Sequence, residues 1–150
     1  MLIGTSAKSI SHTDTVLAKM GSSKTHCFLT GSRYFGWERP DSDWDFFTAN
    51  SKLTETYLFA LGFKEDTKEG YSDSLTRKVF MGHSIHVQLV TSVAQKQELN
   101  TFFSRNKRLL ASPQYNHNWD IIWTPLSKQE QRIAWQTAVS LYQSIRLRSW

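Results

Sequence analysis

The chain has 150 residues, of which 39% are hydrophobic, 13% aromatic and 21% charged, with seven glycines and three prolines. This composition excludes a disordered linker and a collagen-like repeat, and the length predicts a single domain over residues 1–150. Its one cysteine, Cys27, excludes an internal disulfide framework and a multi-cysteine zinc site.

The net charge of +5 is unevenly distributed along the chain. Residues 1–75 carry eight basic and ten acidic side chains, whereas residues 76–150 carry ten basic and three acidic ones. This asymmetry is typical of a protein with a polyanionic or phosphate-bearing partner, and equally of a well-solvated basic surface. No apolar run is long enough to cross a bilayer and no secretory signal is visible, so we expect a cytoplasmic protein without a membrane partner.

Strand-like and helix-like stretches alternate along the chain, which predicts an α/β or α+β fold. In the first half, the expected elements are a helix at 14–20, strands at 25–30 and 43–49, a helix that begins after Asn50 or Ser51 and stops at Gly62, and a polar loop at 64–74. The apolar face of the second helix is expected to contain Leu53, Tyr57, Leu58 and Leu61.

In the second half, the expected elements are strands at 75–80 and 84–90, a helix from Ser92 to about 110, an irregular stretch at 113–125 and a final helix at about 127–147. The two strands are expected to form an antiparallel hairpin across Met81-Gly82-His83. Capping boxes are predicted at Ser92 with Gln95 and at Ser127 with Glu130. The final helix is expected to pack on the domain through Ile133, Ala134, Ala138, Leu141 and Ile145.

Two carboxylates stand out in the stretch GSRYFGWERPDSDWDFF, residues 31–47. On a strand, Asp43 and Asp45 point to one face, while Trp44 and Phe46 enter the core. Two anions about 7 Å apart or less repel each other, and this cost is relieved if a divalent cation, Mg²⁺ or Mn²⁺, lies between them. Magnesium sites of this kind take their remaining ligands from water and substrate phosphates.

A phosphate-binding half precedes the acids. Gly31 lets the backbone approach a ligand closely, and the Ser32 hydroxyl and nearby N–H groups can hold a phosphate oxygen. Arg33 and Arg39 can add charge-assisted contacts. Each half alone is more often an ordinary turn or a solvated strand end, so the hypothesis depends on their joint spacing.

Together the two halves resemble the signature of the DNA polymerase β-like nucleotidyltransferase superfamily. The pattern is most similar to the minimal nucleotidyltransferases (MNT-like), with Gly-Ser-Arg-x-x-Gly, a short basic loop and Pro-Asp-Ser-Asp-x-Asp. The matching positions, without a gap, are Gly31, Ser32, Arg33, Gly36, Arg39, Pro40, Asp41, Ser42, Asp43 and Asp45. The resemblance implies a small mixed sheet flanked by helices, two metal ions and a nucleoside triphosphate substrate such as ATP.

The resemblance also implies roles for individual residues. Asp43 and Asp45 would be catalytic metal ligands for Mg²⁺ or Mn²⁺, and Gly31, Ser32, Arg33 and Arg39 would bind the nucleotide. The reaction would transfer a nucleoside monophosphate to a hydroxyl of a protein, a tRNA or a small molecule. Small members of the family include antitoxins that AMPylate a partner toxin and toxins that modify tRNA, so a toxin–antitoxin role is one expectation.

His86 marks a departure from the family pattern. Such enzymes commonly place a third carboxylate on a later strand, and in the matching segment 85–90 His86 stands at that position. A neutral imidazole can ligate the metal, and suits Mn²⁺ or Zn²⁺ better than Mg²⁺, or it can act as a general base for the acceptor hydroxyl. Alternatively, the second metal site is lost and the fold is a catalytically degenerate module that binds protein or RNA, or His86 is merely a hydrogen-bonded neighbour of the site.

Other residues give weaker signals. Cys27, beside Phe28, is expected to be a small buried thiol and not a nucleophile. Tyr34 or Trp37 could stack on a base or simply pack the loop. The basic cluster at 105–108 could grip an RNA backbone, which would make the protein a plain RNA-binding module, or could stabilise a helix end. The acceptor and the oligomeric state are left open by the sequence.

Overall fold

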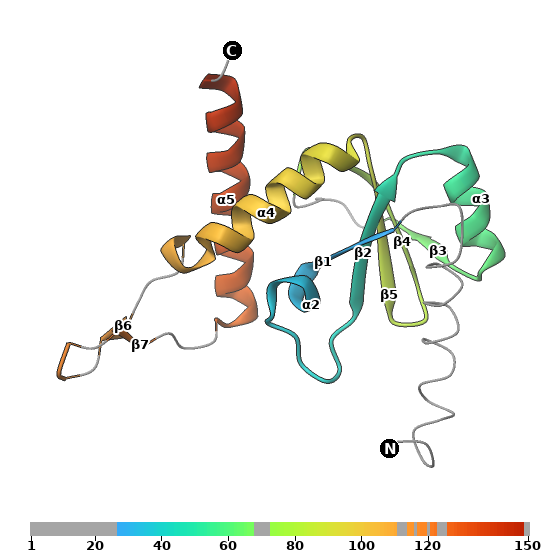
Figure 1. The fold of residues 1–150 in the computed structure, drawn as a ribbon. Coiled ribbons are helices and arrows are strands. Elements are labelled where there is room, and N and C mark those ends of the chain that lie inside the picture. The colour runs from blue at the N-terminus through green and yellow to red at the C-terminus, as the bar shows by residue number, and fades with distance from the viewer. Residues whose placement is uncertain are drawn as a thin grey trace. The chain divides into compact units, whose positions relative to one another are not determined.

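The computed structural model describes residues 27–67, 73–110, 114–115, 117–119, 121–122 and 126–148. Within them the chain is mixed α/β, with a five-stranded mixed sheet, a two-stranded ribbon and four helices (Figure 1), so the predicted class is confirmed. The chain divides into two compact units, Met1–Val93 and Ala94–Trp150. The helix expected at 14–20 lies outside the described residues, as do the first two residues of the strand expected at 25–30.

The first unit is built around the five-stranded sheet. Its elements are β1 (Phe28–Thr30), α2 (Gly31–Phe35), β2 (Trp44–Ala49), α3 (Lys52–Ala60), β3 (Lys64–Asp66), β4 (Thr76–Gly82) and β5 (Ile85–Val90). The strand order is β1-β2-β5-β4-β3, with β2 and β5 parallel and the other neighbouring pairs antiparallel (Figure 1). The parallel pairing of β2 with β5 sets Asp45 directly beside His86.

One face of this sheet carries the main hydrophobic cluster of the unit. Side chains alternate between the two faces of a strand, and the inward set packs around Leu58 of α3 and Phe63. The strand residues of this core and its margin are Trp44, Phe46, Phe80, Ile85, Val87 and Leu89, as the alternation predicts. The side chains of Asp45 and His86 alternate with this set and therefore project from the opposite face.

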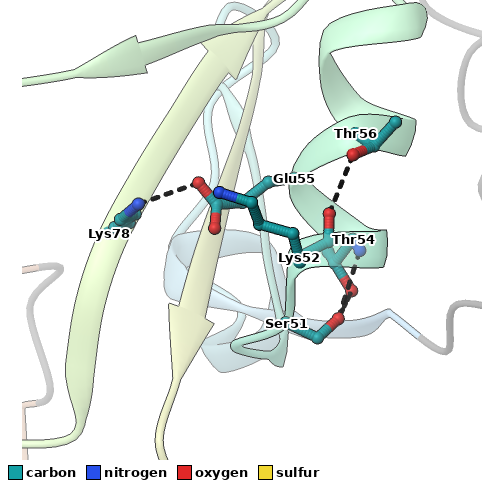
Figure 2. A network of polar contacts seen from close by, with 6 residues as sticks. All are labelled: Ser51, Lys52, Thr54, Glu55, Thr56 and Lys78. Atoms are coloured by element: carbon teal, nitrogen blue, oxygen red, sulfur yellow. Dashed lines mark hydrogen bonds and ion pairs between the residues drawn. The ribbon is translucent and has the colours of Figure 1, made fainter.

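Helix α3 begins at a side-chain cap (Figure 2). The Thr54 amide donates a hydrogen bond to Ser51 Oγ at 3.1 Å, which confirms Ser51 as the N-cap residue. A 2.8 Å ion pair between Glu55 and Lys78 ties the helix to β4. The predicted apolar face was wrong at one position, because Thr54 and Leu58 are buried whereas Leu53 is 74% exposed. Thr54 and Leu58 lie four residues apart on one side of the helix, and Leu53 is rotated away from that side.

The β4–β5 hairpin was predicted correctly, but its turn lies one residue later than expected. His83 and Ser84 form the turn and both have positive φ, 54° and 59°, as a type I′ turn requires. Gly82 is instead the last residue of β4, where an added Cβ would come within 3.3 Å of the Phe63 Cα. A contact of 3.0 Å between His83 Nε2 and the Leu61 carbonyl oxygen holds the turn against the end of α3.

Two short elements of the first unit were missed. Helix α2 follows directly on β1, and β3 lies within the predicted loop at 64–74. The three residues of β3, Lys-Glu-Asp, are all polar or charged, so they lack the apolar alternation typical of a strand. They pair with β4 at the edge of the sheet, where charged side chains remain in solvent and discourage further strand pairing.

The second unit contains two long helices. Its elements are α4 (Val93–Leu110, which begins at the boundary), β6 (Gln114–Tyr115), β7 (Ile121–Ile122) and α5 (Lys128–Arg148). The capping box at the start of α5 is confirmed, because Ser127 N donates to Glu130 Oε1 at 2.9 Å and Glu130 N donates to Ser127 Oγ at 3.2 Å. Helix α5 contacts α4 through Phe103 with Trp135 and through Glu98 with Arg146.

The predicted apolar face of α5 is only partly buried. Ala134 and Ala138 are buried, but Ile133, Leu141 and Ile145 are exposed, so the sequence pattern overestimated the width of the buried stripe. No helix in the described part of the chain combines the length and the hydropathy needed to span a membrane.

Candidate functional site

The Gly-Ser elbow lies against the second acid. Thr30 pairs with Asp45 in the antiparallel β1–β2 ladder, and Gly31 follows at the start of α2 with φ +74°. A Cβ placed on Gly31 would lie 2.8 Å from the Cβ of Asp45 and closer still to its carboxylate. Any side chain at this position would displace Asp45 and strain the backbone, so glycine is required for the approach.

Both acids reach the same imidazole. His86 Nδ1 lies 3.3 Å from Asp45 Oδ1 and 3.7 Å from Asp43 Oδ2. Asp43 immediately precedes β2, and Asp45 is in register with His86 across the parallel β2–β5 pair. The carboxylates therefore lie on one side of the sheet, as the i, i+2 spacing predicts, and His86 joins them from the neighbouring strand.

The charges of this cluster are accessible to solvent. The side chain of Asp43 is 49% exposed, and those of Asp45 and His86 are each 27% exposed. The hydrogen bond to Asp45 raises the pKa of His86; partial burial opposes this rise, and the negative charges of Asp45, Asp43 and Asp66 add to it. The imidazole therefore holds its proton to a higher pH than usual, and in its protonated form it is a counter-cation for the two acids.

Asp66 was not foreseen as a neighbour of this cluster. It lies on β3, in the stretch predicted to be loop, and its charge acts on His86 from the edge of the sheet. Asp66 on β3 pairs with Val79 on β4, and Val79 pairs in turn with Gln88 on β5. Gln88 lies two residues after His86 on the same strand. Asp66 and His86 therefore share a face, a relation that only the strand pairing reveals.

Arg33 is engaged within the protein. Its Nη2 and Nε donate hydrogen bonds to the Ser42 carbonyl oxygen at 2.7 and 3.2 Å, and its guanidinium lies 4.3 Å from the centre of the Trp44 ring. These contacts connect α2 to the segment just before β2. The predicted phosphate contact of Arg33 stays a prediction, and a phosphate would have to share the guanidinium with these partners.

Arg39 is placed differently. Arg39 and Ser42 close a β-turn, in which Ser42 N donates to the Arg39 carbonyl oxygen at 3.0 Å and Arg39 N donates to Ser42 Oγ at 2.7 Å. Pro40 occupies the second position of the turn, where its fixed φ is favourable. The Arg39 side chain is exposed, and no hydrogen bond or ion pair joins its guanidinium to the described residues, so it is accessible to a phosphate.

Ser32 completes the elbow as the second residue of α2. Its carbonyl oxygen accepts hydrogen bonds from the amides of Gly36 and Trp37, the latter at 2.8 Å, which fixes the chain leaving the elbow. Its side chain is half-buried, and its hydroxyl makes no hydrogen bond with the described residues. The hydroxyl is therefore available to a ligand beside Asp45.

The donor set near the elbow suits a hard cation. Among the residues that the structure describes, no three His, Cys, Asp or Glu side chains form a group arranged to hold a metal ion. Asp43 and Asp45 supply two carboxylates, the usual protein share of a magnesium site that takes its remaining ligands from water and phosphates. A cation bound there would compete with His86 Nδ1 for carboxylate oxygens that lie 3.3 and 3.7 Å from it.

The remaining candidates from the sequence are a thiol, two aromatic residues and a basic cluster. Cys27, expected to be buried, is partly buried; burial raises the pKa of its thiol to about 11, against a hydrogen bond with Thr48 that lowers it. Tyr34 is exposed on α2, and Trp37 lies with its ring 6.1 Å from that of Phe35. The basic residues at 105–108 lie in the last turns of α4, in the second unit.

Comparison with known proteins gives no relative: no family model, no curated protein and no solved structure matches this chain.

Proposed function

We propose that this chain is a metal-dependent nucleotidyltransferase with a polymerase β-like fold, which transfers a nucleoside monophosphate from a nucleoside triphosphate to a hydroxyl group of a protein, a tRNA or a small molecule. The observation that carries the proposal is the packing of Asp45 against Gly31, with Asp43 on the same side. This packing brings the carboxylates and the Gly-Ser elbow to one place. A metal-bound triphosphate needs the carboxylates and the phosphate-binding elbow together. An ordinary turn and a solvated strand end have no need to lie against each other.

Each residue of the cluster has a role in this proposal. Asp43 and Asp45 would hold Mg²⁺ or Mn²⁺, which when bound neutralises phosphate oxygens and activates the acceptor hydroxyl. Ser32 and the backbone at Gly31 would receive phosphate oxygens, and the exposed guanidinium of Arg39 would add a charge-assisted contact.

The transfer itself is a displacement at phosphorus. The acceptor oxygen forms a bond to the α-phosphorus, and the bond from that phosphorus to the oxygen bridging to the β-phosphate breaks. Pyrophosphate leaves with the electron pair of the broken bond, and the acceptor proton passes to water or to neutral His86.

A second candidate function is favoured by the position of His86. Its Nδ1 lies 3.3 and 3.7 Å from the two carboxylates, which raise its pKa, so a protonated imidazole would supply positive charge where a metal would bring it. On this alternative the chain is a catalytically degenerate nucleotidyltransferase fold that binds a protein or RNA. The two functions differ in whether a divalent cation displaces the imidazole.

Label transfer from nucleotide tests the proposal. The parent protein and the Asp43→Asn and Asp45→Asn variants would be incubated with each α-³²P-labelled triphosphate, with Mg²⁺ or Mn²⁺, and with host-cell lysate as the source of acceptors. We expect label to be transferred by the parent with one triphosphate and lost in both variants. Transfer that persists in both variants contradicts the assigned roles of the acids.

Thermal unfolding separates the alternatives when no label is transferred. A parent whose melting temperature does not respond to Mn²⁺ and triphosphate supports the degenerate binding module. RNA affinity with a steep salt dependence that Asp45→Asn leaves unchanged supports a plain basic RNA-binding protein instead.

A further inference from the structure

We infer that Arg33 is a positioning residue for Asp43, a role distinct from the phosphate contact that its place in the motif suggests. This inference rests on the function proposed above, because it concerns how the first metal-binding carboxylate is held. Asp43 precedes the first residue of β2, so the ladder hydrogen bonds of the sheet do not fix it directly. Its carboxylate is half exposed, and its distance to His86 Nδ1, 3.7 Å, is too long for a hydrogen bond.

Arg33 contacts the residue on each side of Asp43. On the N-terminal side, two N–H groups of the guanidinium donate to the Ser42 carbonyl oxygen, at 2.7 and 3.2 Å. On the C-terminal side, the guanidinium lies 4.3 Å from the centre of the Trp44 ring. Trp44 is also anchored by its own amide, which donates to the Ser84 carbonyl oxygen at 2.9 Å. The backbone of Asp43 is thus held between two contacts of one side chain.

The origin of Arg33 adds to this role. It is the third residue of α2, the helix that begins at Gly31, and Gly31 is the residue against which Asp45 packs. Helix α2 therefore helps to position both carboxylates. Gly31 leaves the space that Asp45 occupies, and the guanidinium of Arg33 holds the backbone on both sides of Asp43.

These contacts need an arginine and not merely a positive charge. A guanidinium is planar, stacks on an aromatic face and directs several N–H groups along fixed directions. A lysine ammonium at the same place keeps the charge, but it cannot stack flat on Trp44 while donating two bonds to one carbonyl oxygen. If Arg33 served only as a phosphate contact, lysine would replace it with a smaller loss.

Mn²⁺ binding in the absence of nucleotide tests this inference without phosphate. Free Mn²⁺ would be measured by electron paramagnetic resonance during titration of the full chain, at a temperature where circular dichroism shows every variant folded. The variants are Arg33→Lys and, as a reference for loss of the acid, Asp43→Asn. Arg77→Lys, at an exposed position on β4, is the matched control for an arginine-to-lysine change in the same unit. Under these conditions a loss of stability alone does not alter the metal affinity.

We expect Arg33→Lys to weaken Mn²⁺ binding about 10- to 100-fold, the range found when groups that orient metal ligands are removed. Arg77→Lys should bind as the parent does. If Arg33→Lys binds Mn²⁺ as tightly as the parent while Asp43→Asn does not, the positioning role is overturned and the proposed function stands. If the parent itself binds no Mn²⁺, the proposed function fails and the inference falls with it.

Trp44→Phe keeps the test decisive if Arg33→Lys does not fold. Phenylalanine preserves an aromatic side chain beside the core and leaves both hydrogen bonds to Ser42 possible, but it offers the guanidinium a smaller ring. We expect a smaller weakening of Mn²⁺ binding in the same direction. Unchanged affinity in Trp44→Phe, with Arg33→Lys unfolded, counts against the stacking contact and overturns the inference.

Discussion

The packing of Gly31 against Asp45 gives the sharpest prediction for a single substitution, Gly31→Ala. Two costs follow from the structure. Alanine at φ +74° loses about 1–2 kcal/mol relative to glycine because of the left-handed backbone. The added Cβ, 2.8 Å from the Asp45 Cβ, forces a shift that costs about 1–3 kcal/mol, as overpacking does elsewhere. The expected loss in the free energy of unfolding is therefore about 2–5 kcal/mol.

Gly36→Ala is the matched control for this change. Gly36 also has positive φ, +81°, but a Cβ there would meet nothing within 4 Å, so it carries the backbone cost alone. Urea unfolding of the two variants should differ by about 1–3 kcal/mol, and Gly31→Ala alone should lose Mn²⁺ binding because the Asp45 carboxylate has moved. Equal destabilisation of the two variants, with equal Mn²⁺ affinity, would refute the reasoning.

Three further predictions concern His86 and Arg39. In metal-free protein the raised pKa of His86 stabilises the fold. This contribution is complete below the unfolded-state pKa near 6.5 and is lost as the pH rises through the folded-state pKa. The free energy of unfolding, measured in urea across this window, should therefore fall as the pH rises in the parent, and His86→Gln should remove this dependence. His86→Asp replaces the counter-cation with a third carboxylate, so titration calorimetry should show tighter Mn²⁺ binding than in the parent; weaker binding would mean that the acids do not form a cation site. Arg39→Lys should retain more triphosphate affinity than Arg39→Ala, and the difference should shrink at high salt; identical affinities would remove Arg39 from the site.

Much of the site follows from local patterns in the sequence. The i, i+2 spacing of Asp43 and Asp45 places both acids on one side because strand side chains alternate. The apolar alternation of residues 85–90 likewise predicts that His86 faces away from the core, and the structure confirms it. These features depend on residues that lie close together in the sequence, which is why the sequence is sufficient.

Features that depend on contacts between residues distant in the chain could not be predicted from the sequence. From the sequence, the charge of Arg33 suggested a phosphate contact. In the structure its guanidinium contacts the carbonyl oxygen of Ser42, nine residues later, and the indole ring of Trp44. The parallel pairing of β2 with β5 sets Asp45 beside His86 and is a property of the topology. The influence of Asp66 depends on an edge strand whose polar residues read as a loop.

Localising Mn²⁺ on the protein is the most direct test of whether the elbow and the acid pair form a metal–nucleotide site. A titration with substoichiometric Mn²⁺ and triphosphate would be followed in the ¹H–¹⁵N spectrum of the full chain, because the paramagnetic ion broadens nearby amide signals first. We predict that the amides of Gly31, Ser32, Asp43, Asp45 and His86 broaden before all others. Broadening that is uniform, or that begins in the helices α4 and α5, would contradict the proposed site.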